Sequence, residues 1–197
     1  MGNISGNPFA KLNRVYYATH VFDESIEGPF KEALLDLFRN VRVPAVLIGG
    51  LAVAYYAEEP LSTNDVDVLV ATPEQAEELA GQIGIDFDRA GAYTFSHRKT
   101  HIAVDVVTFQ AGGDKVFKAL EDPVEQVMSG VTVKIARPEW IIALKLERGI
   151  RDDLRGRRDQ VHIITLLKDA NPDIGSIMPF LTRRERKRLE DLRQVGA

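Results

Sequence analysis

The sequence predicts an α/β (α+β) fold in which a mixed sheet is flanked by helices and followed by a helical C-terminal part. Apolar, β-branched runs recur at residues 43–48, 65–71 and 101–109, as expected of buried strands. Segments with helical spacing lie between these runs, and strands interleaved with helices are typical of an α/β or α+β sheet domain. Beyond residue 137 helical patterns dominate, so the last third of the chain is expected to be helical.

Each element has its own local signal. Phe30, Leu34, Leu37 and Phe38 have the spacing of one face of an amphipathic helix. The other expected elements follow in order: a strand at 43–48, a helix at 50–57, a strand at 65–71, a helix from Pro73 capped by Thr72, a hairpin of 93–96 with 101–109, helices at 115–120 and 124–128, a strand at 131–136, a helix from Pro138 to Gly149, and a basic helix opened by a Thr182–Glu185 capping box and running to about Arg193.

The composition is that of a globular protein, with 45% hydrophobic and 27% charged residues. We expect an irregular arm over residues 1–28, a sheet domain over 29–136, and a helical part over 137–197 packed on it. No apolar run approaches the ~20 residues of a membrane span, and the N-terminus lacks a signal-peptide pattern. Without cysteine there is no disulfide or thiolate site, so a cytoplasmic location is the default expectation.

The net charge of −4 conceals an uneven distribution. From Lys145 to Ala197 there are 13 Lys and Arg against 9 Asp and Glu, so the rest of the chain is acidic. A basic tail suits a polyanion such as RNA, which is held largely through its phosphates. The alternative is a solvated helix face.

Three acids are expected to meet on the sheet. Asp65 and Asp67 are two residues apart in a strand, so their side chains point to the same face. Asp105 lies in a run of valines, where a buried carboxylate is costly unless it is paired or bound to a cation. Taken singly, the three acids also fit a turn cap, a solvent-facing strand position and an exposed edge position. If the two strands are neighbours, the carboxylates form one cluster.

A glycine pair precedes this cluster. Gly49 and Gly50 follow an apolar strand and open a helix, where backbone N–H groups can bind phosphate oxygens. Paired carboxylates hold Mg²⁺ ions that neutralise the same oxygens. Ser62 and Thr63 either shape the loop before Asp65 or donate a hydroxyl to phosphate. Together these residues predict a site for a nucleoside triphosphate (NTP).

The whole pattern resembles the DNA polymerase beta-type nucleotidyltransferase superfamily, on the segment GGLAVAYYA…STNDVDVLV and the later strand Asp105. With the late LKL segment and the pair Asp153 and Asp159, it is most similar to the AbiEii-like branch, which includes toxins of type IV toxin–antitoxin systems. The resemblance covers about residues 43–167. It implies a nucleotidyltransferase-type mixed sheet, two Mg²⁺ ions held by Asp65, Asp67 and Asp105, and nucleotide binding by Gly49, Gly50, Ser62, Thr63 and Asp159.

The resemblance also gives Lys145 a role. It would be a catalytic cation directed at the triphosphate, whereas the alternative is a surface lysine with an extended stem. Three positions depart from the family pattern: Leu61 replaces a common arginine, and Asp152 and Gly156 replace a common lysine and acid. These departures put Asp153 in question more than Asp159.

The function implied is Mg²⁺-dependent transfer of a nucleoside monophosphate from an NTP to an acceptor hydroxyl. Arg155, Arg157 and Arg158 are candidates to face the acceptor, and the basic tail favours tRNA or another RNA. A toxin would also have an antitoxin protein as partner. The alternatives are a small-molecule or protein acceptor, or an inactive relative that only binds a nucleotide or a partner. His97 and His101 indicate an exposed turn or a lip of the substrate site, and are not expected to bind metal.

Overall fold

The computed structural model describes residues 21–22, 28–59, 61, 63–108, 113–149 and 153–196, and the statements below refer to these residues. Most of the expected N-terminal arm, together with Ser62, lies outside them. The elements are α2 (Pro29–Asn40), β1 (Val46–Ile48), α3 (Gly49–Tyr56), β2 (Asp65–Leu69), α4 (Pro73–Ile83), β3 (Phe87–Arg89), β4 (Thr94–His97), β5 (Ala103–Val107), α5 (Asp114–Glu121), β6 (Val124–Met128), β7 (Val131–Ile135), α6 (Pro138–Gly149), α7 (Leu154–Asp169), α8 (Ile174–Ile177), the 3₁₀ helix η1 (Met178–Phe180) and α9 (Arg183–Gly196).

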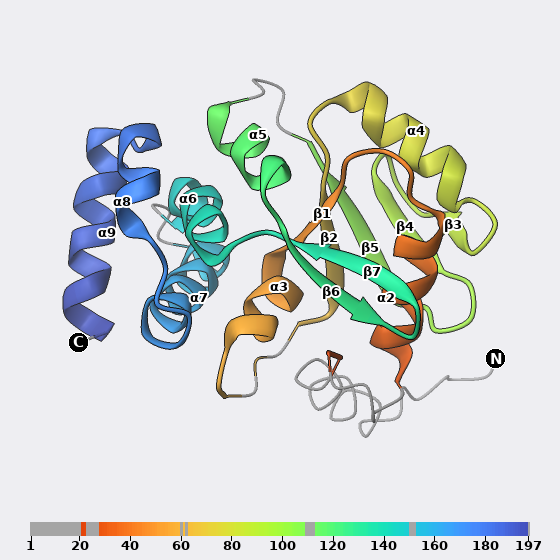
Figure 1. Ribbon diagram of the computed structural model, residues 1–197, viewed down its shortest axis with the longest axis horizontal. Coiled ribbons are helices and arrows are strands. Elements are labelled where there is room, and N and C mark those ends of the chain that lie inside the picture. Colours follow the sequence, from red (N-terminus) through yellow and green to blue (C-terminus); the bar gives the residue numbers. More distant parts are fainter. Residues whose placement is uncertain are drawn as a thin grey trace, which may run out of the picture.

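Seven strands of the described chain form one mixed sheet, in the order β3-β4-β5-β2-β1-β7-β6. The pairs β2–β5 and β1–β7 are parallel, and the other neighbours are antiparallel. Helices α6 to α9 gather at one end of the molecule, whereas α4 lies at the other end (Figure 1). The predicted fold class, a mixed sheet flanked by helices with a helical C-terminal part, is confirmed.

Local sequence explains most of these elements. In α2 the apolar stripe of Phe30, Leu34 and Leu37 is fully buried, and the helix packs against β7 and α4. The Thr72 side chain caps α4 by accepting a hydrogen bond of 3.3 Å from the Gln75 N–H, as predicted. The capping box that opens α9 also forms, with Thr182 and Glu185 each accepting a hydrogen bond from the other's backbone N–H.

The helix expected at residues 124–128 is wrong, because this segment is strand β6. Its residues alternate between partly buried and exposed positions, and Met128 pairs with Val131 across a two-residue turn. Both turn residues, Ser129 and Gly130, have positive φ values of 48° and 74°, the requirement of a tight hairpin whose twist matches its strands. Strand β3 has only three residues and was not predicted, and β1 begins at Val46 rather than at residue 43.

The C-terminal helices α6 and α7 meet the rest of the described structure around α3. Helix α6 packs against α7, α5 and α3, and α7 packs against α3 and α9. None of the helices in the described ranges is long and apolar enough to cross a membrane. The first turn of α3 therefore lies where strand residues and helical residues come together.

Candidate active site

The three predicted acids converge. Strands β2 and β5 pair in parallel with Asp67 opposite Asp105, and Asp65 lies two residues before Asp67 on the same face. The intervening Val66 and Val104 are fully buried on the other face of the sheet, so the period of two directs the carboxylates into a shared space. One oxygen from each of the three carboxylates lies within 4.8 Å of the others, and all three residues are half-buried.

The chemistry of this cluster fits a hard divalent cation. Three ionised carboxylates so close together repel one another unless a cation neutralises them. Carboxylate oxygens are the ligands that Mg²⁺ prefers, and no sulfur or imidazole belongs to the cluster. The residues present therefore fit the metal that the sequence predicts.

Gly49 adapts the backbone to this cluster. Its φ is +74°, which L-residues rarely adopt, and a Cβ at this position would lie 1.8 Å from Oδ2 of Asp67. A Cβ on Gly50 would lie 2.7 Å from Oγ1 of Thr63. The two glycines thus allow the backbone at the start of α3 to approach Asp67 and Thr63.

Helix α3 opens toward the same pocket. It starts at Gly49 without a side-chain cap from Ile48, and Gly49 and Gly50 both line the pocket. The first N–H groups of a helix have no partner within the helix and carry a partial positive charge, so this end of α3 suits an anion.

Thr63 lies beside Gly50 and is 4% exposed. Its hydroxyl donates a hydrogen bond of 3.0 Å to Oδ1 of Asp65. Between the two sequence interpretations of this threonine, its contacts favour shaping the loop and orienting Asp65. Ser62, predicted with it, lies outside the described residues.

Lys145 is buried rather than extended along the surface. It is 4% exposed on α6, and its Nζ donates a hydrogen bond of 2.7 Å to Oδ1 of Asp159 on α7, which is 5% exposed. Both residues line the pocket that contains the three acids. The ion pair therefore joins the two helices beside the acidic cluster.

The remaining residues of the α7 region divide into two groups. Asp153 is the N-cap of α7 and accepts a hydrogen bond of 2.7 Å from the Gly156 N–H, so its role is local. Arg155 and Arg158 are exposed residues at the pocket, whereas Arg157 does not line it.

His162 lines the same pocket and was not predicted. It is 4% exposed, and burial together with the nearby charge of Lys145 lowers its pKa from 6.5 to about 3. Its position three residues after Asp159 was the available signal, because residues at i and i+3 share a helix face.

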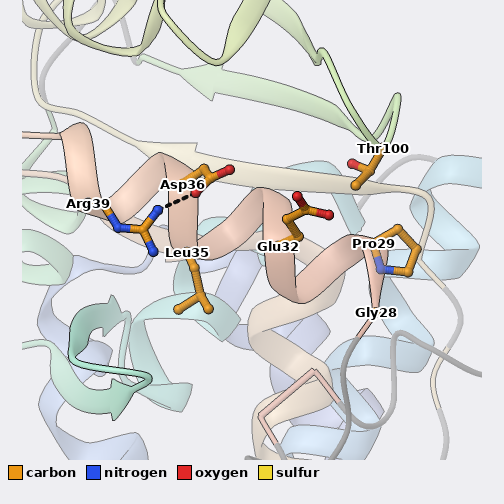
Figure 2. Close-up of a pocket in the computed structure, with 7 residues that line it drawn as sticks. All are labelled: Gly28, Pro29, Glu32, Leu35, Asp36, Arg39 and Thr100. Carbon is orange, nitrogen blue, oxygen red and sulfur yellow. Dashed lines mark hydrogen bonds and ion pairs between the residues drawn. The ribbon is translucent and has the colours of Figure 1, made fainter.

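A second pocket lies along α2, and none of the three clustered acids lines it (Figure 2). There Asp36 forms an ion pair with Arg39, and its other oxygen is 3.2 Å from Nε2 of His97. His97 is fully buried, and its Nδ1 is 2.8 Å from the Thr100 hydroxyl, so the expectation of an exposed turn is wrong for this histidine. These contacts tie the turn after β4 to α2. His101, in the same turn, is exposed.

Comparisons with known proteins support the fold. No protein-family model and no curated protein matches this sequence. Among solved structures, an antigenic nucleotidyltransferase-like protein from Paracoccidioides brasiliensis is similar, with a TM-score of 0.60 and 17% identity over 91% of this chain and 88% of that one. ANT(2″)-Ia in complex with adenylyl-2″-tobramycin aligns with a TM-score of 0.47 and 14% identity over 85% of this chain and 94% of that one, a similarity too low to support an argument. The chain thus has the fold of a nucleotidyltransferase-like protein.

Proposed function

We propose that this protein is a nucleotidyltransferase that transfers a nucleoside monophosphate from an NTP to an acceptor hydroxyl. The observation that carries the proposal is the cluster of Asp65, Asp67 and Asp105 carboxylates, with oxygens within 4.8 Å of one another, at the N-terminal end of α3. A carboxylate cluster beside the first N–H groups of a helix combines ligands for a cation with hydrogen-bond donors for phosphate. The sheet domain (29–136) would supply the carboxylates and the helix N–H groups. The helical part (137–197) would supply the positively charged side chains around them.

Asp65, Asp67 and Asp105 would hold two Mg²⁺ ions. When bound, such ions neutralise phosphate oxygens and lower the pKa of a coordinated hydroxyl. The Thr63 hydroxyl keeps one oxygen of Asp65 in a fixed orientation through its 3.0 Å hydrogen bond. Because Gly49 has no Cβ, the carboxylate of Asp67 has room beside the start of α3.

The transfer step balances as a substitution at phosphorus. The acceptor hydroxyl oxygen forms a bond to the α-phosphorus, the bond from the α-phosphorus to the bridging oxygen of the β-phosphate breaks, and pyrophosphate leaves. Asp105 is the candidate base for the hydroxyl proton. Positioning and electrostatics supply most of the catalysis in such transfers.

The triphosphate would lie along the start of α3. The N–H groups of Gly49 and Gly50, with the hydroxyl of Ser62, would bind its oxygens, while the Thr63 hydroxyl would keep its hydrogen bond to Asp65. Lys145 would offset the charge of the leaving pyrophosphate. Asp159 accepts a hydrogen bond from Lys145 and would orient that cation toward the nucleotide.

An RNA acceptor is supported by Arg155 and Arg158. Both arginines are exposed and line the pocket, where they would contact the phosphates of an anionic acceptor. The resemblance to AbiEii-like toxins supports the same acceptor class, tRNA or another RNA, and adds an antitoxin protein as an expected partner.

An incorporation assay tests this proposal. The protein is incubated with Mg²⁺ and each α-³²P-labelled NTP, together with total tRNA, cell-extract protein, or no acceptor. The paired variant Asp65→Asn/Asp67→Asn is compared with Asp88→Asn, an exposed acid of the same sheet whose partner is Arg98. We expect label on RNA with the wild type and Asp88→Asn, and none with the paired variant.

The outcomes separate the alternatives. Label on protein would show that the acceptor is a protein side chain instead of RNA. Absence of label with all acceptors, while NTP binding persists, would contradict transfer to RNA or protein. Label that is unaffected in the paired variant would rule out the acidic cluster as the site.

A further inference from the structure

His162 has a buried nitrogen that the fold does not explain. The side chain is 4% exposed, and no described residue forms a hydrogen bond with its Nδ1. Burying a polar atom without a partner destabilises a protein, whereas an apolar side chain of similar size would avoid that cost. Packing alone therefore gives no reason for histidine at this position.

The surroundings of His162 belong to the proposed nucleotide site. A Cβ on Gly50 would lie 3.7 Å from Cε1 of His162, so the imidazole lies against the first turn of α3. The charged groups facing it are Lys145 from α6 and Asp159 and Arg158 from α7. This arrangement brings the ring to the end of α3 where an anion is most stable.

The imidazole is neutral at physiological pH. Burial, followed by the positive charge of Lys145, lowers the pKa of His162 to about 3. A neutral imidazole carries one N–H group and can donate one hydrogen bond without adding charge. Lys145 and the two arginines already provide the positive charge of the pocket.

We propose that His162 is a nucleotide-binding residue whose Nδ1–H donates a hydrogen bond to a phosphate oxygen of the bound NTP. The inference rests on the proposed function, since it assigns a ligand within the same site. His162 would position the triphosphate between α3 and α7, and the otherwise unpaired nitrogen would gain its partner only in the complex. The free protein would then be less stable than with an apolar side chain at this position, but its affinity for the NTP would be higher.

Calorimetric titration with Mg²⁺ and each NTP, without acceptor, tests the assignment. His162→Leu removes the donor but keeps an apolar side chain of similar size. His162→Asn keeps an amide at about the position of Nδ1. His101→Asn changes an exposed histidine outside the pocket and serves as the matched control.

We expect the Leu variant to weaken NTP binding by about tenfold, the usual loss for a hydrogen bond to a charged group. The Asn variant should keep most of the affinity, and His101→Asn should bind as the wild type does. The melting temperature of the free Leu variant should equal or exceed that of the wild type. Inorganic tripolyphosphate with Mg²⁺ should lose affinity by the same factor as the NTP.

Unchanged NTP affinity in the Leu variant would overturn the inference while leaving the proposed function intact. Weaker NTP binding with unchanged tripolyphosphate binding would overturn the assignment to phosphate. If the wild type binds no NTP in the presence of Mg²⁺, the proposed function fails together with this inference.

Discussion

At the scale of single residues, the position of the Asp67 carboxylate depends on the absence of a side chain at Gly49. The glycine is required twice, by its φ of +74° and by the 1.8 Å that would separate its Cβ from Oδ2 of Asp67. A side chain at this position would displace either the carboxylate or the start of α3. The geometry of the acidic cluster therefore requires glycine at position 49.

Gly49→Ala tests this dependence. We expect the positive φ to cost about 1–2 kcal/mol of unfolding free energy, and the displaced carboxylate to reduce transfer about 100-fold. Chemical denaturation and the incorporation assay measure the two effects.

Gly81→Ala is the matched control. Gly81 is inside α4, and among the described residues nothing beyond its neighbours and the adjacent helix backbone lies within 4 Å of a Cβ built there. Alanine should therefore stabilise the helix by about 0.5–1 kcal/mol. Equal activity of Gly49→Ala and the wild type would show that the close approach is unnecessary.

At the scale of elements, polar contacts join the C-terminal helices to one another and to α5. Lys145 and Asp159 connect α6 with α7. Glu185 closes the capping box of α9 and also accepts a hydrogen bond of 2.5 Å from Lys115 of α5. Burial raises the pKa of the Glu185 carboxyl, but the hydrogen bonds donated by Lys115 and Thr182 outweigh it, so the pKa lies below its ordinary value.

Glu185→Gln should therefore destabilise the protein in a pH-dependent way. Glutamine can preserve the capping box, so the variant removes mainly the charge facing Lys115. Because the folded state lowers the pKa of Glu185, its contribution is complete above the ordinary value of 4.5 and is lost as the pH falls through the folded value.

We expect the substitution to lower the free energy of unfolding by about 1–2 kcal/mol at pH 7. This loss should shrink as the pH falls below 4.5. Urea titrations at several pH values measure it. A cost that is constant over this range would contradict a role for the carboxylate charge.

At the scale of the whole molecule, we expect the acidic cluster to lower the stability of the metal-free protein. Two neighbouring strands hold three carboxylates within 4.8 Å of one another. We expect their mutual repulsion to oppose folding, and a bound cation to stabilise the folded state by mass action. The site and the stability of the fold are thus linked.

The substitution Asp105→Asn should raise the free energy of unfolding of the metal-free protein. It should also reduce the stabilisation that added Mg²⁺ provides. We expect about 1 kcal/mol of added stability in the absence of Mg²⁺, from reduced repulsion between the carboxylates. Added Mg²⁺ should raise the melting temperature of the wild type more than that of the variant.

Asp88→Asn provides the comparison, because Asp88 pairs with Arg98 at the exposed edge of the same sheet. It should respond to Mg²⁺ as the wild type does. An equal response of Asp105→Asn and the wild type would show that Mg²⁺ does not bind at the cluster.

The sequence alone determined which residues could form the acidic cluster and where most elements lie. The spacing of Asp65 and Asp67 sets their common face, and the apolar runs around them and around Asp105 indicate strands, because strand periodicity is local. The Thr72 cap and the Thr182–Glu185 box are likewise signals contained within four residues. Such features can be predicted without knowledge of the rest of the chain.

Only the tertiary structure decided what depends on distant partners. Residues 124–128 form a strand because they pair with β7 through a turn with positive φ, a choice their own side chains do not specify. Lys145 is buried because α7 supplies Asp159, and His162 lies in the pocket because α7 packs against α3. Burial and ion pairing result from packing between elements far apart in sequence, which local periodicity cannot encode.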